Sequence, residues 1–295
     1  MNILKYQAFL KTVEAGSITV AAQQLGYTQS AVSKMIRDLE QEWDMELLCR
    51  NRKGVELTSD GLSILPAVRE IMKEYENLQY SLSAIHGMQR GTLRLGCFSS
   101  VSASILPAVL KSFSTAYPGI RVQLFHGEYR EISEWLSRGS IDCGFLGESE
   151  AMEFSSVPVF RDSLVAIVPA DHPLAGADTY PVSRIPEESF ISLKEVRDYD
   201  FAQFFDQNRI LPKIRYEVTN DMVLLSMVES GLGISLVYDM ILKPARFNVV
   251  RLPLDRTKER TVYISVREGT RSSPVTDLFI RHILAYVKAS GFRSI

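Results

Sequence analysis

The sequence predicts an α/β protein built from an N-terminal winged helix-turn-helix, a long linker helix and a two-lobed unit. Three observations support this prediction. Short amphipathic helical patterns open the chain, a sustained apolar repeat of three and four residues follows them, and strand and helix patterns then alternate toward the C-terminus. A chain of 295 residues is also too long for one ordinary core and fits two or three domains.

Changes of pattern along the chain set the expected domain boundaries. The segment "HGMQRG" between the apolar repeat and the first strand is the expected hinge. We expect the winged helix-turn-helix at 1–58, the linker helix at 59–86, the hinge at 87–91, the first lobe at 92–161 and 267–295, and the second lobe at 162–266. A chain that crosses twice between two α/β lobes describes a ligand-binding clamp.

The composition is that of a soluble globular protein, with 46% hydrophobic and 23% charged residues. No apolar run reaches the roughly eighteen residues of a membrane span. The N-terminus reads as an amphipathic helix rather than a signal peptide, so we expect a cytoplasmic location and no membrane partner. The net charge of −2 does not indicate a nucleic-acid partner, so the placement of the cations decides that question.

The first forty-odd residues predict three helices separated by glycine turns. Gly16 ends the first helix, Ser17 or Thr19 caps the second, and Gly26 ends the second. Thr28 then starts a third helix that runs to about Asp44. Two helices joined by a tight turn form a helix-turn-helix. The alternative is an ordinary helical hairpin with a solvated polar face.

The third helix has two different faces. Val32, Ile36, Leu39 and Trp43 form its apolar stripe. The polar face is expected to carry Gln29, Ser30, Ser33, Lys34 and Arg37. Short polar side chains at a helix N-terminus, followed by cations one turn later, suit a helix that enters the major groove end-first.

The next segment predicts a two-stranded wing. Leu47–Arg50 and Val55–Leu57 read as strands around a turn. Arg50, Arg52 and Lys53 gather at its tip, where they would lie along a phosphate backbone or reach a minor groove. A solvated turn is the alternative.

A long helix follows from Thr58, and its apolar residues recur at spacings of three and four. The seam contains Leu62, Leu65, Val68, Ile71, Tyr75, Leu78 and Leu82. We expect nothing in the small N-terminal domain to be large enough to cover such a stripe, so the stripe should pair with a second copy of the chain. A dimer would also hold two recognition helices at a fixed separation on DNA.

The remainder alternates strands and helices, which predicts a parallel, doubly wound sheet. The stretch "FSSVSAS" follows the first of these strands and opens a helix. Backbone N–H groups and the hydroxyls of Ser99, Ser100 and Ser102 would face a ligand there, and a small anion such as a metabolite carboxylate is the expected guest. Ordinary N-capping by one of these serines is the alternative.

Several stretches together resemble the LysR-type transcriptional regulators. They are "FLKTVEAGSIT", "AAQQLGYTQSAVSKMIRDLE", "LLCRNRKGVELTSDG", "GTLRLG" and "VESGLGISLV", and the resemblance spans the whole chain. It implies a winged helix-turn-helix and a periplasmic-binding-protein-like effector domain. It also implies a homotetramer, formed as a dimer of dimers, on promoter DNA. Ser30 stands where this family usually has proline, which leaves open which bases are read.

The resemblance further implies which residues do the binding. DNA contact is carried over to the polar face of the third helix and to the wing cations named above. The effector pocket is carried over to Ser99, Ser100, Val101, Ser102, Glu128, Tyr129, Gly147, Ser192, Phe201 and Thr219. Arg161, Lys194 and Arg197 are cationic candidates for the distal end of a dianion, with plain surface charge as the alternative.

Other functional classes have less support. No nucleophile elbow, phosphate loop, zinc motif or dinucleotide fingerprint is present, so neither an enzyme nor a cofactor or metal site is expected. A redox switch through Cys97 and Cys143 is the alternative within the same fold, and a transport protein would leave the N-terminal part unexplained. The expected partners are promoter DNA, further copies of the chain, a small effector and, as a further candidate, RNA polymerase.

Overall fold

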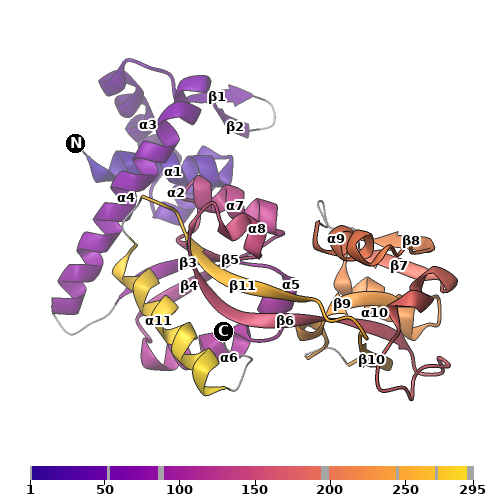
Figure 1. Ribbon diagram of the computed structural model, residues 1–295. Coiled ribbons are helices and arrows are strands. Elements are labelled where there is room, and N and C mark those ends of the chain that lie inside the picture. The colour runs from indigo at the N-terminus through magenta and orange to yellow at the C-terminus, as the bar shows by residue number, and fades with distance from the viewer. Residues whose placement is uncertain are drawn as a thin grey trace. The chain divides into compact units, whose positions relative to one another are not determined.

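The computed structural model of the protein describes residues 2–51, 54–85, 90–193, 199–243, 246–269 and 272–290. The chain forms two compact units (Figure 1). The first extends through Gly91, and the second begins at Thr92 and contains nearly all of the residues that follow. No helix in the described part of the chain is long and apolar enough to cross a membrane.

Three short helices open the first unit. They are α1 (Ile3–Ala15), α2 (Ile18–Leu25) and α3 (Gln29–Trp43). Their N-caps are Asn2, Ser17 and Thr28, and the residues that end them in the left-handed conformation are Gly16, Gly26 and Asp44. The capping side chains accept hydrogen bonds from the first backbone N–H groups of each helix, so the helix boundaries are set locally. The predicted helix-turn-helix is confirmed, and Gly16, Gly26 and Thr28 bound its helices as predicted.

The wing is also confirmed, as an antiparallel hairpin of β1 (Leu48–Asn51) and β2 (Gly54–Leu57). The hairpin packs against the turn after α1, because the Val55 N–H donates to the Gly16 carbonyl at 2.9 Å. A Cβ at Gly54 would lie 2.6 Å from that carbonyl oxygen, and the φ angle there is 132°. Glycine is therefore required at this position, beside the turn of the wing.

The linker helix α4 (Ser59–Ile85) does not present one uniform seam. Leu65 and Val68 are buried in a core with Tyr6, Phe9 and Leu39 of the same chain. Leu62, Leu78 and Leu82 are 59%, 54% and 45% exposed. The expectation that the small N-terminal domain cannot cover this stripe is therefore wrong for Leu65 and Val68, which α1 and α3 cover. Beyond that core, the exposed apolar residues are Leu78 and Leu82.

The second unit is organised around a seven-stranded sheet with the order β10-β6-β11-β5-β3-β4, in which β9 also pairs with β6. The first lobe contains β3 (Gly91–Cys97), β4 (Ile120–His126) and β5 (Cys143–Leu146), with α5 (Ser99–Ala103), α6 (Leu106–Ala116), α7 (Tyr129–Ser137), α8 (Glu148–Ala151) and α11 (Pro274–Ala289). Strands β3 and β5 are parallel, as predicted, but β6 pairs antiparallel with β9, β10 and β11, and β11 pairs antiparallel with β5. The sheet is therefore mixed, which corrects the prediction of a parallel sheet.

The second lobe is built on the far half of β6 (Ser155–Pro169). It contains η1 (Val182–Glu187), β7 (Phe190–Leu193), α9 (Tyr199–Asn208), β8 (Ile214–Val218), α10 (Asp221–Glu229), β9 (Ser235–Tyr238), η2 (Asp239–Leu242) and β10 (Val249–Pro253). Strands β7 and β8 form a separate parallel pair, and apolar cores lie around Phe190 and Leu225.

Two long strands join the lobes. Strand β6 and strand β11 (Glu259–Val266) run antiparallel side by side (Figure 1), with Arg260 opposite Asp162. Strand β11 also pairs with β5 of the first lobe through Tyr263–Ser265. The chain therefore returns to the first lobe within β11, before the predicted boundary at 266/267.

Candidate functional site

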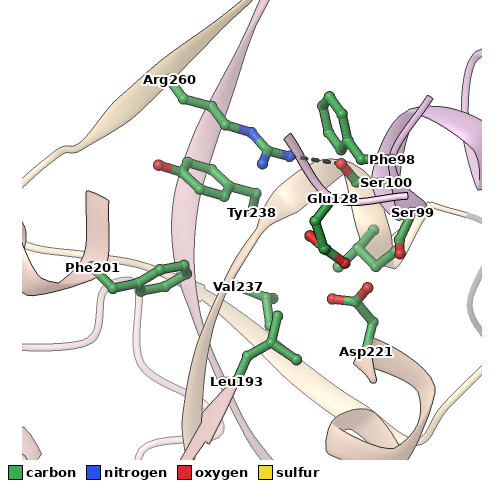
Figure 2. A pocket seen from close by; sticks show the side chains of 11 residues that line it. Phe98, Ser99, Ser100, Glu128, Leu193, Phe201, Asp221, Val237, Tyr238 and Arg260 are labelled. Atoms are coloured by element: carbon green, nitrogen blue, oxygen red, sulfur yellow. Dashed lines mark hydrogen bonds between the residues drawn. The ribbon is translucent and has the colours of Figure 1, made fainter. Parts of the chain in front are cut away.

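A cavity lies within the second unit, lined by residues from both lobes (Figure 2). The empty space within it is about 390 Å³ when its opening to solvent is included. The lining residues are Phe98, Ser99, Ser100, Glu128, Leu193, Phe201, Asp221, Val237, Tyr238, Ile241 and Arg260. The first lobe supplies the segments after β3 and β4, and the second lobe supplies the ends of β7 and β9 and the start of α10.

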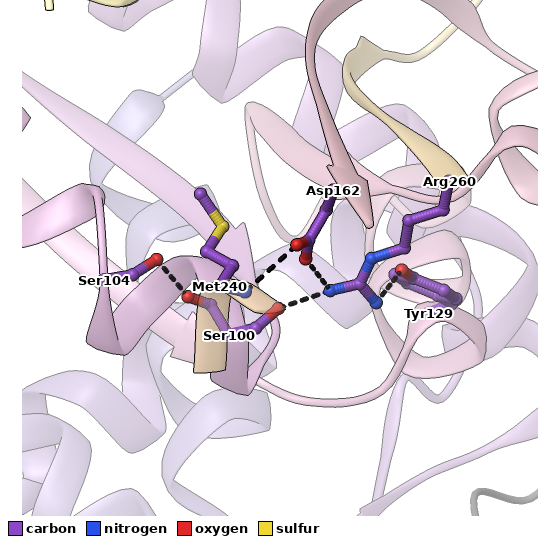
Figure 3. A network of polar contacts seen from close by, with 6 residues as sticks. All are labelled: Ser100, Ser104, Tyr129, Asp162, Met240 and Arg260. Carbon is purple, nitrogen blue, oxygen red and sulfur yellow. Dashed lines mark hydrogen bonds and ion pairs between the residues drawn. The ribbon is translucent and has the colours of Figure 1, made fainter. Parts of the chain in front are cut away.

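The guanidinium of Arg260 is the centre of the polar network beside this cavity (Figure 3). Its Nη2 donates to Ser100 Oγ at 2.6 Å and to Asp162 Oδ2 at 2.9 Å, and its Nη1 donates to the Tyr129 hydroxyl at 3.0 Å. Asp162 Oδ1 in turn accepts the backbone N–H of Met240 at 3.0 Å. One buried arginine therefore connects α5, α7, β6 and, through Asp162, η2.

Two aromatic rings lie within cation–π distance of the same guanidinium. Its central carbon lies 3.8 Å from the centroid of the Tyr238 ring and 5.0 Å from that of Phe98. Burial alone would lower the pKa of Arg260, but Tyr129, Asp162 and Tyr238 together raise it, so the group stays charged. Its Nε is buried and has no hydrogen-bond partner among the described residues.

Two carboxyl groups face the cavity on its other side. Glu128 immediately precedes α7, and Asp221 is the first residue of α10. Figure 2 shows the two carboxyl groups directed toward one another across the cavity. Ser99 hydrogen-bonds Asp221, and its hydroxyl lies 3.4 Å from His126 Nε2. Burial, and for Glu128 also the charge of Asp221, raises the pKa of both carboxyls.

The remaining wall of the cavity is apolar. Leu193, Val237 and Ile241 contribute aliphatic side chains, and Phe201 of α9 adds an aromatic ring. Leu193 follows Ser192 in β7, and successive side chains of a strand point to opposite faces, so the leucine faces the cavity in place of the predicted serine. The cavity therefore suits a small molecule with one polar end and one apolar part.

The structure brings part of the predicted effector set together. Ser99, Ser100, Glu128 and Phe201 line the cavity, and Tyr129 stands behind it on Arg260. The predicted residues that do not line it are Val101, Ser102, Gly147, Ser192 and Thr219.

Three of these non-lining residues have another structural role. Val101 is fully buried, and the Ser102 hydroxyl donates to the Ser99 carbonyl at 3.0 Å. A Cβ at Gly147 would lie 2.9 Å from the Tyr129 ring, so this glycine makes room for that tyrosine. Arg161 is exposed outside the cavity lining, whereas Lys194 and Arg197 lie outside the described residues.

Sequence reasoning missed Arg260 and Asp221. A signal for Arg260 was present, because "ERTVYISV" places it in the same period-2 register as the buried Val262 and Ile264. A charged residue on the buried face of a strand must find a partner. Asp221 carried no comparable signal, since an acidic residue in the first turn of a helix is common.

The expected anion site at "FSSVSAS" has a different arrangement. The Ser100 hydroxyl is bonded to Arg260, and the Ser99 hydroxyl is bonded to Asp221. The protein's own carboxylate thus lies where a ligand anion was expected. Glu128 adds a second negative group nearby, which disfavours an anion at this end of the cavity.

The residues of α3 that we predicted to contact DNA are exposed, with one exception. Gln29, Ser30, Lys34 and Arg37 are exposed. Ser33 is 7% exposed, so its side chain is largely covered by the protein. It directly follows Val32 and precedes Ile36 by about one turn, so it lies at the edge of the apolar stripe rather than opposite to it.

The structure describes only one of the three predicted wing cations. Arg50 is in β1, while Arg52 and Lys53 lie outside the described residues.

Cysteine and metal chemistry are not supported by the described residues. No group of three or more His, Cys, Asp or Glu side chains among them is placed to hold a metal ion. Cys97 and Cys143 are buried cysteines that form no disulfide, and they lie on the neighbouring strands β3 and β5. Burial raises the pKa of Cys97 to about 11, which keeps it protonated and weakly reactive at neutral pH.

Comparisons with known proteins bear on both units. Residues 3–62 match the model of the bacterial regulatory helix-turn-helix protein, lysR family, and residues 86–288 match that of the LysR substrate binding domain. The chain is 32% identical over 284 residues to YvbU of Bacillus subtilis (strain 168), an uncharacterized HTH-type transcriptional regulator. That match covers 95% of this chain and 97% of the relative.

Solved structures share the fold. Full-length CbnR complexed with its target DNA matches with a TM-score of 0.67 and 20% identity, covering 99% of this chain and 100% of that chain. The effector binding domain of QuiR in complex with shikimate matches with a TM-score of 0.62 and 24% identity, covering 69% of this chain and 99% of that chain.

Proposed function

Because this chain belongs to the LysR family of bacterial transcriptional regulators, we propose that it contacts promoter DNA through α3 and the wing, and that a small effector in the described cavity controls this contact. It acts by binding rather than by catalysis, as the family does. Its partner DNA is chromosomal, so we place its action in the cytoplasm.

The cavity with Arg260 beside it is the observation that carries the effector role. A ligand there touches side chains of both lobes, and Arg260 joins the lobes through Ser100, Tyr129 and Asp162. Binding then favours one lobe arrangement over another by the difference in the ligand's affinity for the two. The QuiR effector domain in complex with shikimate supports a ligand site in this part of the fold.

We further propose that the protein acts as a homodimer and assembles into a homotetramer. Exposed Leu78 and Leu82 on α4 supply an apolar surface for pairing with a second copy. Ligand-driven lobe closure would change the spacing of the dimers and the bend of the DNA. RNA polymerase then meets a differently presented promoter.

The DNA-binding part of the proposal is tested with Lys34→Ala combined with Arg37→Ala. Genomic fragments selected by the purified protein provide the DNA, and fluorescence anisotropy at several salt concentrations gives the affinity. The logarithm of the binding constant K falls as the logarithm of the salt concentration rises. Each lost phosphate or base contact should make this slope less steep by about one and weaken binding about tenfold. Lys11→Ala is the matched control, because Lys11 is an exposed cation on α1 that pairs with Glu14.

Two results would count against the proposal. The first is wild-type protein that selects no specific fragment. The second is a double variant that binds as tightly as the Lys11→Ala control. Circular dichroism spectra of all three proteins establish that each is folded.

A further inference from the structure

We infer that the cavity binds a small molecule with a protonated amine, which lies between the Glu128 and Asp221 carboxylates while its apolar part packs on Leu193, Val237 and Ile241. This inference rests on the proposed function and names the ligand class for that site. It replaces the anionic class expected from the sequence.

The carboxylate pair needs a cation. Glu128 comes from the first lobe and Asp221 from the second, and their charges disfavour each other across the cavity. The Glu128 carboxylate accepts no hydrogen bond from the described residues, and Asp221 accepts one from Ser99. An ammonium group has three donors, so it can bond both carboxylates at once and remove their repulsion.

Arg260 does not meet this need. Its Nη2 is bonded to Asp162 and Ser100, and its Nη1 to Tyr129, so it donates no hydrogen bond to either cavity carboxyl, although its charge opposes the rise in the pKa of Asp221. The described side chains that line the cavity therefore include two carboxyl groups and one guanidinium. The guanidinium is already paired with Asp162. A cationic ligand group balances this charge, and an anionic group would add to it.

The rest of the lining narrows the class. Beyond the carboxylates, Leu193, Val237, Ile241 and Phe201 offer an apolar surface for a short carbon chain or ring. The buried Nε of Arg260 is a donor without a partner among the described residues. A ligand that also carries an acceptor, such as an amino acid, can satisfy it, whereas a simple alkylamine cannot. Both belong to the inferred class.

Binding in the cleft also has a mechanical consequence. An ammonium held by Glu128 and Asp221 joins the start of α7 in the first lobe to the start of α10 in the second. Without it, the two carboxylates repel each other across the opening. The bound cation therefore favours closure of the lobes, which is the motion that the proposed regulation requires.

The test is isothermal titration of the full-length protein at pH 7.5 with a four-carbon series of probes, supported by thermal denaturation. The probes are putrescine, 4-aminobutyrate, 1,4-butanediol and succinate, followed by a wider panel of amino acids, diamines and dicarboxylates. We expect binding among the amines and none for 1,4-butanediol or succinate. The amine with the lowest Kd should bind at least tenfold more weakly to Glu128→Gln and to Asp221→Asn.

Glu134→Gln is the matched control, because it makes the same substitution on α7 at an exposed residue outside the cavity lining. It should keep the wild-type Kd. Differences in melting temperature between the variants and the wild type do not affect the comparison, because each Kd is measured on folded protein. Circular dichroism verifies that each variant is folded.

Three outcomes would overturn the inference: succinate or another amine-free acid binds while amines do not, amine affinity is unchanged in both carboxylate variants, or no amine in the panel binds. None of these touches the DNA-binding test with Lys34 and Arg37. Loss of specific DNA selection by the wild-type protein would instead overturn the proposed function.

Discussion

Arg260 and Asp162 stand directly opposite each other on the two strands that join the lobes, and their Nη2 and Oδ2 atoms lie 2.9 Å apart. Both side chains are buried, so each neutralises a charge that would otherwise be very costly in this position. Because Arg260 also bonds Ser100 and Tyr129, the pair fixes the first lobe to the crossing strands.

Removing one member of this pair should strongly destabilise the second unit. We expect Arg260→Met to lower the free energy of unfolding by about 3–5 kcal/mol, because Asp162 would remain buried without its partner. Urea denaturation followed by circular dichroism measures this change. The double variant Arg260→Met with Asp162→Leu should recover most of the loss. A double variant as unstable as the sum of both single variants would show that the two residues do not act as a pair.

The two serines of α3 should differ in what their loss affects. Ser30 is exposed near the helix N-terminus, whereas Ser33 is buried. We expect Ser30→Ala to weaken binding to a selected DNA fragment several-fold without changing stability. Ser33→Ala should leave DNA affinity unchanged and lower stability by about 0.5–1.5 kcal/mol, typical of a lost buried hydrogen bond. Anisotropy and thermal denaturation of both variants separate these effects, and the reverse pattern would contradict the burial of Ser33.

The linker helix allows a similar separation of folding from assembly. Leu78 and Leu82 are exposed, so replacing both with Glu should shift the protein toward monomer in sedimentation velocity while the first unit stays folded. Leu65→Ala removes a buried side chain and should cost about 2–5 kcal/mol of stability. An unchanged sedimentation coefficient for the Leu78/Leu82 variant would show that pairing uses another surface.

How much the sequence could predict depends on how local the determining interactions are. Gly16, Gly26 and Thr28 set helix boundaries through contacts with residues only a few positions away, and all three were predicted. The alternation of strands and helices likewise predicted the α/β fold. Such features need no knowledge of the tertiary structure.

The candidate site depends instead on distant residues. Arg260 bonds Ser100 and Tyr129 across 160 and 131 residues of sequence, and no local pattern predicts that. Ser99 was predicted from the serine-rich segment after a strand and Glu128 through the resemblance, but the approach of Asp221 to them was not predicted. The predicted ligand charge differs from the one we infer for the same reason, since the prediction considered the serine segment without the carboxylate that meets it. Ser33 was predicted on the polar face of α3 but is buried, because it lies at the border between the polar and apolar faces.

The cysteines give a prediction about oxidation. Cys97 and Cys143 are buried and burial raises the pKa of Cys97 to about 11, so its thiolate is scarce at neutral pH. Cys49 is exposed on β1. Mild peroxide at pH 7 should therefore modify Cys49 first, as read by mass spectrometry of peptides, and should leave the other two reduced. A Cys97–Cys143 disulfide that forms under these conditions and alters DNA binding would favour the redox-responsive alternative.

The raised pKa of Glu128 predicts how ligand-free stability depends on pH. Burial contributes most to this shift, Asp221 and Glu131 add to it, and His126 opposes it. A carboxyl whose pKa is higher in the folded state binds more protons there than in the unfolded chain. Stability is therefore lost as the pH rises from the unfolded pKa through the folded one.

We accordingly expect Glu128→Gln to melt at a higher temperature than the wild type at pH 8, because glutamine cannot ionise. The difference should shrink as the pH falls toward about 4, where the wild-type carboxyl is protonated as well. Thermal denaturation at intervals between these pH values measures it, with the exposed Glu134→Gln variant as the control. A difference that stays constant with pH would mean that Glu128 ionises as readily in the folded protein as in the unfolded chain. The repulsion between Glu128 and Asp221, on which the inferred amine site depends, would then be too weak to select a cationic ligand.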